Sequence, residues 1–194
     1  MRLFRIAAIR QPDAVDSWRA APIGFSLTEI RILSYASIAL FFGVNALGLL
    51  IWGSAYFEGF ASFAKGQSIA LTTAYVIAAL LAYHVMHELI HIALHPDRGL
   101  SDRTMIGVKA AAFFVIYNGE ISKENLLRVV IAPFAVLTPL CALAALAPFS
   151  PIFLANMFGL HLSACAGDLL LYRKLKNGPE FAWMWNAYTS AYIK

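Results

Sequence analysis

Charge is scarce in this sequence. Only 13% of its 194 residues are charged and 60% are hydrophobic, whereas ordinary soluble domains carry about 25% charged residues. A chain with so little polar surface cannot cover itself in water, which excludes an ordinary soluble domain and favours a membrane protein. The basic residues border the apolar runs and form no large patch, so we expect no nucleic-acid partner.

Cysteine is also rare. Cys141 and Cys165 are the only two, and both lie inside apolar runs, where a disulfide between secreted loops is not expected. The sequence contains no internal repeat, and a chain this short lacks the inverted-repeat signature of a transporter.

Four apolar runs are long enough to cross a bilayer, which takes about 20 helical residues. They are 32–52, 68–94, 126–147 and 152–172. The predicted fold is therefore an all-α integral membrane protein with four transmembrane helices. Its core is expected at 32–172, after a cytosolic arm at 1–31 that does not resemble a cleavable signal, and before a cytosolic tail at 173–194.

Lysine and arginine are distributed unevenly among the connections. They occur in 1–31, 95–125 and 173–194, whereas the connections on the other side contain only Lys65. Lys and Arg are retained on the cytoplasmic side of a membrane. We therefore expect a multi-pass protein of the cell membrane with both termini in the cytosol.

The connection 95–125 contains an apolar stretch, 110–117, that is too short to span a membrane. Its aromatic and β-branched residues favour an extended chain, and the following Asn118-Gly119 is a turn signal. We expect a short strand, hairpin or re-entrant segment between the second and third spanning helices. It could hold an unwound substrate by strand addition. The candidate contacts are Phe114, Val115, Ile116 and Asn118.

Histidine is concentrated near the end of the second run. Four of the five histidines, together with one glutamate, are expected on one face of the helix because they are three or four residues apart. They are His84, His87, Glu88, His91 and His95. A carboxylate at membrane depth costs about 2.5–3.5 kcal/mol, which favours a functional site over histidines that are merely packed in a core.

Within this group, residues 87–91 form the pattern His-Glu-Leu-Ile-His, or HExxH. Two histidines one turn apart can bind one Zn²⁺, and the intervening glutamate can act as general base on zinc-bound water. The pattern therefore predicts His87 and His91 as metal ligands and Glu88 as the catalytic residue.

A zinc site usually needs a third protein ligand. Asp168 is the only other acidic residue within the four runs. Asp168 lies about as far from the inner, cytosolic end of the fourth run as His87 and His91 lie from the inner end of the second run. At 1.5 Å per residue, all three lie about 5–10 Å below the cytosolic boundary. Asp168 is therefore the predicted third ligand.

Other polar residues have weaker assignments. His84 and His161 have matching depths and are candidates for a proton-relay pair around the site. Cys165 could be an alternative ligand but is expected to be a small packing residue. His95, before Pro96, is expected to be a helix-end residue.

An HExxH on one membrane helix with a ligand aspartate on a later helix resembles the site-2 protease class of intramembrane zinc metalloproteases. Within it, the short chain and Ala166-Gly167-Asp168 resemble a membrane-embedded zincin peptidase family over roughly residues 83–171. The resemblance implies that His87, His91 and Asp168 bind Zn²⁺ and that Glu88 is the catalytic base. The chain lacks the Leu-Asp-Gly sequence of better-known members and has no room for a PDZ domain.

The predicted function is zinc-dependent hydrolysis of peptide bonds in membrane protein substrates, near the cytosolic face of the lipid bilayer. One alternative is a non-catalytic metal-binding scaffold, which would not need Glu88. Another is a membrane di-iron oxidase, because His87, His91 and His95 resemble a histidine box, although five histidines are too few for such a site.

Overall fold

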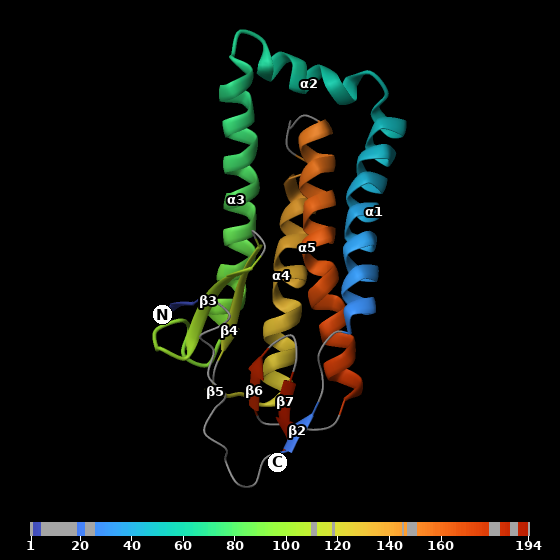
Figure 1. Cartoon of the computed structure of the whole chain (residues 1–194). Coiled ribbons are helices and arrows are strands. Elements are labelled where there is room, and N and C mark those ends of the chain that lie inside the picture. The colour runs from blue at the N-terminus through green and yellow to red at the C-terminus, as the bar shows by residue number, and fades with distance from the viewer. Residues whose placement is uncertain are drawn as a thin grey trace. The chain divides into compact units, whose positions relative to one another are not determined.

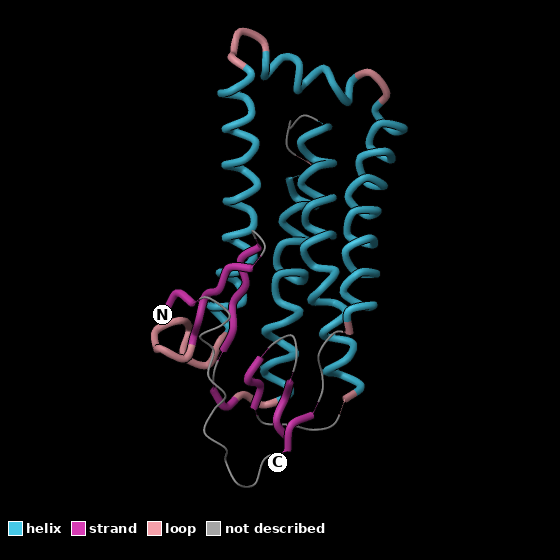
Figure 2. Tube along the Cα trace, in the orientation of Figure 1, coloured by secondary structure: helices cyan, strands magenta, loops and turns pink. Residues whose placement is uncertain are grey.

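The computed structural model describes residues 2–4, 19–21, 26–109, 112–117, 119–144, 146, 151–178, 183–186 and 190–193. This part of the chain is mostly helical, with short strands in addition (Figure 1, Figure 2). The helices are α1 (Leu27–Trp52), α2 (Ala55–Ala64), α3 (Ile69–Leu94), α4 (Lys123–Ala144) and α5 (Pro151–Asn177). The strands are β1 (Arg2–Phe4), β2 (Arg19–Ala21), β3 (Thr104–Lys109), β4 (Ala112–Tyr117), β5 (Gly119–Glu120), β6 (Trp183–Asn186) and β7 (Ser190–Ile193).

Four helices, α1, α3, α4 and α5, are long and apolar enough to cross a membrane. This confirms the predicted fold class, a mostly helical chain with four helices of membrane-spanning length, and indicates a multi-pass membrane protein. In α1 and α3 only 6% of the most apolar window is buried within the chain, compared with 39% in α4 and 33% in α5. The apolar side chains of α1 and α3 are therefore available to lipid.

The first spanning helix begins at Leu27, five residues before the predicted run. Ser26 and Glu29 form a capping box, in which the Ser26 N–H donates to Oε2 of Glu29 (2.8 Å) and the Glu29 N–H donates to Oγ of Ser26 (3.2 Å). Lys174, near the end of α5, pairs with the same carboxylate at 2.7 Å. The prediction counted apolar residues only and therefore missed this polar first turn.

The ends of the later helices also differ from the predicted runs. α5 continues to Asn177, with Lys174 and Lys176 in its last turn, where positive charge complements the helix dipole. α4 begins at Lys123 and ends at Ala144, about three residues earlier than predicted at each end. Parts of the predicted arm at 1–31 and tail at 173–194 lie outside the described residues, so these domain boundaries stay predictions.

The chain divides into two compact units. The first, which we call the strand unit, comprises residues 1–30, 85–132 and 168–194. The second, the helical unit, comprises 31–84 and 133–167. Four helices, α1, α3, α4 and α5, contribute residues to both units, and each unit has its own buried contacts.

In the strand unit, a buried apolar cluster joins the start of α4 to the end of α5. Its members are Tyr117, Ile121, Leu126, Val129, Val130, Leu171 and Leu175. Their burial fixes the first turns of α4 against the last turns of α5. This packing supports the neighbouring polar site described below.

The strands of this unit form two small sheets, ordered β1-β3-β4 and β2-β7-β6-β5. β3 and β4 are antiparallel, with Thr104 opposite Tyr117 and Ile106 opposite Val115. This confirms a hairpin between the second and third spanning helices. The partner strand β3 was not predicted, and Asn118, the expected turn residue, lies outside the described residues. β4 is an edge strand of the described sheet.

In the helical unit, α1 and α5 approach closely through small residues. Oγ of Ser37 donates to the Ser163 carbonyl (3.2 Å), and Oγ of Ser163 donates to the Ser37 carbonyl (2.7 Å). A Cβ at Gly159 would lie 3.0 Å from the Phe41 ring. Small residues and interhelical hydrogen bonds of this kind are typical of membrane-helix interfaces.

The short helix α2, which connects α1 to α3, was not predicted. Its ten residues are too few to span a bilayer. Tyr56 is buried, and its hydroxyl donates to the side-chain oxygen of Asn45 on α1. A Cβ at Gly48 would meet the Tyr56 ring at 2.9 Å, so Gly48 provides the space for this contact.

Candidate metal centre

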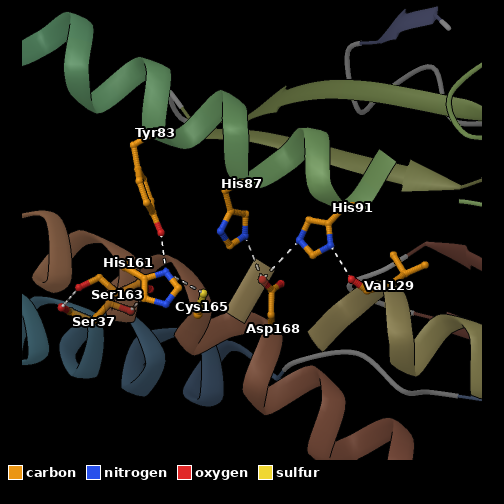
Figure 3. Close-up of polar contacts among 9 residues, drawn as sticks. All are labelled: Ser37, Tyr83, His87, His91, Val129, His161, Ser163, Cys165 and Asp168. Carbon is orange, nitrogen blue, oxygen red and sulfur yellow. Dashed lines mark hydrogen bonds and ion pairs between the residues drawn. The ribbon is translucent and has the colours of Figure 1, made fainter. Parts of the chain in front are cut away.

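Two histidines and one aspartate of the strand unit meet at one point (Figure 3). His87 and His91 lie one turn apart on α3, so their rings project from the same face, 5.1 Å apart between centroids. Asp168 lies on α5 and directs its carboxylate toward both imidazoles. Its Oδ2 lies 3.0 Å from Nε2 of His87 and 3.4 Å from Nε2 of His91.

These distances suit a tetrahedral metal ion. Zn²⁺ binds histidine nitrogen and carboxylate oxygen at about 2.0–2.2 Å, so two such ligands lie about 3.3–3.5 Å apart around a tetrahedral ion. The His91–Asp168 separation of 3.4 Å falls within this range and the His87–Asp168 separation of 3.0 Å is shorter, and the three ligand atoms all lie within 4.8 Å of one another. His87 and His91 come from the HExxH pattern, and the structure brings Asp168 together with them. Their roles as metal ligands stay a prediction.

The hydrogen bonding of His91 is compatible with a metal-ligand role. Nδ1 of His91 lies 2.9 Å from the carbonyl oxygen of Val129, which can only accept, so Nδ1 carries the proton. In the neutral ring, Nε2 is then a lone pair facing the Asp168 carboxylate. The contact is favourable when Nε2 carries a second proton, which makes an ion pair with Asp168, or when a metal ion lies between the two atoms. A metal ion would use Nε2 as its ligand atom.

Glu88 follows His87 on α3 and is half-buried. Its position between the two ligand histidines is the one that HExxH gives to the base. Its role is not tested by the geometry and stays a prediction.

His95 belongs to a separate buried network at the end of α3. Thr104 donates its hydroxyl to Oδ1 of Asp97 (2.7 Å), so the contact of Nδ1 of His95 with the Thr104 oxygen (3.0 Å) requires the proton on Nδ1. Oδ1 of Asp97 also accepts the Gly99 N–H (3.0 Å). These contacts agree with the expected helix-end position of His95.

The network shifts the pKa values of both titratable members. Burial lowers the pKa of His95 to about 4, against the opposing effect of Asp97. For Asp97, burial acts in the raising direction, but hydrogen bonds from Ser101, Thr104 and Gly99 lower its pKa to about 2. At neutral pH His95 is therefore neutral and Asp97 is charged.

His161 is fully buried in the helical unit. Its Nδ1 lies 2.6 Å from the Tyr83 hydroxyl and its Nε2 lies 2.7 Å from the Thr138 hydroxyl, while the ring stacks on Phe134. Cys165 is also buried, with Sγ 3.6 Å from Nδ1 of His161. Both ring nitrogens therefore have hydroxyl partners, which the sequence alone did not identify because Tyr83 and Thr138 are 78 and 23 residues away.

The predicted pairing of His84 with His161 is not tested by these contacts and stays a prediction. Among the predicted substrate contacts, Phe114, Val115 and Ile116 lie on the edge strand β4. Ile116 is buried and Val115 is half-buried. Asn118 lies outside the described residues.

The site also contains a residue that the sequence prediction missed, Val129. It acts through its backbone carbonyl, and every residue has one, so the identity of the residue does not indicate this role. The signal that could have identified it is Pro133, four residues later in α4.

A family model described as "Putative zincin peptidase" matches residues 80–183, which include His87, His91 and Asp168. The match covers more than half of the chain. The protein therefore belongs to this zincin-like peptidase family. Neither the comparison with curated proteins nor that with solved structures gives a match.

Proposed function

We propose that this protein is an intramembrane zinc metallopeptidase that hydrolyses peptide bonds of membrane protein substrates. The observation that carries the proposal is the meeting of His87, His91 and Asp168 from two membrane-length helices, with Glu88 adjoining His87 in the sequence. Membership of a zincin-like family supports peptide hydrolysis as the reaction.

In the proposed mechanism, His87, His91 and Asp168 hold the metal. A bound Zn²⁺ supplies Lewis-acid chemistry, polarising the scissile carbonyl and lowering the pKa of water toward about 7. Glu88 accepts the proton of the attacking water and then gives it to the leaving amine. The Val129 carbonyl holds His91 in one tautomer, so that its Nε2 faces the reacting centre.

We further propose that the reaction takes place near the cytosolic face of the cell membrane, with both termini in the cytosol. The uneven distribution of Lys and Arg among the connections supports this orientation. The metal ligands lie in the last turns of α3 and within the last ten residues of α5, so water has a short path to them.

A membrane-spanning substrate helix has its carbonyls hydrogen-bonded and must unwind before it can be cut. Within the described sheet β4 pairs with β3 alone, so its other edge can pair with such an extended segment. We propose that β4 binds the substrate by strand addition.

The deciding experiment measures metal content and cleavage together, on detergent-purified protein and a model membrane substrate, for wild type and Glu88→Gln. The proposal expects one zinc per chain in both proteins and cleavage by wild type only. Zinc in both without cleavage by either, over a panel of membrane substrates, would favour the non-catalytic scaffold. Absence of metal from protein never exposed to chelators would reject the site.

A further inference from the structure

Pro133 removes a hydrogen-bond donor from the interior of α4. In an α-helix the N–H of each residue donates to the carbonyl four residues earlier, and proline has no N–H. α4 runs from Lys123 to Ala144 with Pro133 inside it. The carbonyl of Val129 therefore lacks its usual helical donor.

That carbonyl accepts a hydrogen bond from a candidate metal ligand instead. Nδ1 of His91 lies 2.9 Å from the Val129 oxygen (Figure 3). Val129 is 4% exposed and Pro133 is fully buried, so solvent does not compete for this acceptor. A backbone carbonyl cannot donate, so the contact fixes the proton of His91 on Nδ1.

We propose that Pro133 is a positioning residue of the metal centre. By freeing the Val129 carbonyl, it holds His91 in the Nδ1-protonated tautomer with Nε2 directed at Asp168. The inference rests on the proposed function, because it takes His91 to be a metal ligand. Loss of the outer hydrogen-bond partner of a ligand histidine typically costs about 10–100-fold in metal affinity.

The same helix offers a matched control. Pro139 is six residues further along α4 and frees the carbonyl of Ala135 by the same reasoning. Ala135 and Pro139 are both exposed and belong to no part of the candidate site. Replacing Pro139 changes the helix in the same chemical way without reaching His91.

The first measurement is the zinc affinity of full-length protein in detergent, by competition with a chromophoric chelator. Pro133→Ala restores an N–H that competes for the Val129 carbonyl, and should weaken zinc binding by about 10–100-fold. Pro139→Ala should stay within about twofold of wild type, well short of that loss. Equal affinity of Pro133→Ala and wild type would overturn the inference.

Because Pro133 is buried, its replacement also removes packing. Lactic acid at position 133, introduced by in vitro translation, lacks both the ring and the N–H. It should recover most of the affinity lost in Pro133→Ala, since the Val129 carbonyl is again free for His91. An affinity as low as that of Pro133→Ala would assign the loss to packing and reject the role of the carbonyl.

A spectroscopic measurement on metal-free wild type separates this inference from the proposed function. With ¹⁵N-labelled histidine, the His91 signal is assigned by its loss in His91→Gln. We expect Nδ1-protonated His91 in wild type and a mixture of tautomers in Pro133→Ala. A wild-type ring protonated on Nε2 and not on Nδ1 would overturn the inference. Failure of wild type to bind zinc would instead overturn the proposed function.

Discussion

Nε2 of His87 and Oδ2 of Asp168 lie 3.0 Å apart, although 81 residues separate them in the chain. The contact joins α3 to α5 through two of the most polar groups of these apolar helices. The same carboxylate oxygen lies 3.4 Å from Nε2 of His91, so it faces both histidines. The predictions below begin with this site.

Asp168→Asn should greatly reduce zinc binding. The substitution keeps the shape of the side chain but removes the negative charge that offsets the metal ion. We expect a loss of affinity above about 100-fold, the upper end for loss of an outer partner alone. Metal content after dialysis against a weak chelator measures it. Glu120→Gln, on the exposed residue of β5, is the control and should retain zinc.

Replacing either of two glycines of α1 by alanine should affect the stability of the protein differently. A Cβ at Gly48 would lie 2.9 Å from the Tyr56 ring and 3.0 Å from Cβ of Ala155, so Gly48→Ala should destabilise the protein by about 1–3 kcal/mol. A Cβ at Gly43 meets nothing within 4 Å, so Gly43→Ala should be neutral or stabilising by up to about 1 kcal/mol. Thermal unfolding in detergent compares them, and equal midpoints would contradict the packing around Gly48.

Stability should depend on pH through His95. Its pKa is lowered to about 4 in the folded protein from an ordinary 6.5, so the unfolded chain binds a proton between these values that the folded chain does not. The free energy of unfolding therefore falls as pH drops from 6.5 to 4, by about 3 kcal/mol in total from this group. Asp97, with a pKa of about 2, stays charged throughout this range.

His95→Asn isolates that contribution. The amide can donate to Thr104 but does not titrate, so the variant should lose less stability than wild type between pH 6.5 and 4. The measurement is the unfolding midpoint of both proteins across this range. Parallel pH profiles would show that His95 is not the group responsible.

Val115→Pro should reduce substrate cleavage while zinc content stays unchanged. Proline removes a backbone N–H from the edge strand β4, where we propose that the substrate pairs. Val115→Thr keeps the N–H and the β-branched shape and should cleave at nearly the wild-type rate. An unaltered rate in Val115→Pro, with the hairpin intact, would remove strand addition from the mechanism.

His84→Ala and His161→Ala should lower activity without loss of bound zinc if the two histidines relay protons, as the sequence predicts. Tyr83→Phe removes one hydroxyl partner of His161 and leaves its ring packing in place. The comparison of cleavage rate with zinc content decides the matter. Full activity in both alanine variants would leave the pair with a packing role only.

The sequence predicted those parts of the fold and site that depend on local spacing or on rarity. HExxH places His87 and His91 on one face by helical period alone, and Asp168 was identified because acidic residues are rare within the apolar runs. The strand β3 was missed because Thr104, Gly107 and Lys109 interrupt its apolar residues, so no continuous apolar stretch marks it. Helix α2 was missed because a short helix has no length signal.

The hydrogen-bond partners of the histidines could not be predicted from spacing along one helix. Tyr83 contacts His161 only after two helices far apart in the sequence have packed, and Thr104 on β3 contacts His95 across the turn that follows α3. Hydroxyl residues are common, so residue type alone does not mark these partners. Pro133 is different, because its effect on the Val129 carbonyl follows from covalent structure and could be inferred from the sequence once the helix was known.

The ion pair between Glu29 and Lys174 can form only late in the synthesis of the chain. The two residues are 145 positions apart, so at about 5–20 residues per second Lys174 is synthesised roughly 7–30 s after Glu29. Asp168 likewise follows His87 by 81 positions, or roughly 4–16 s. Neither the ion pair nor the three-residue site can exist until α5 has been made. Metal loading is therefore expected to follow translation of the whole bundle, and a nascent chain arrested before α5 would carry its HExxH histidines into the membrane without their third partner.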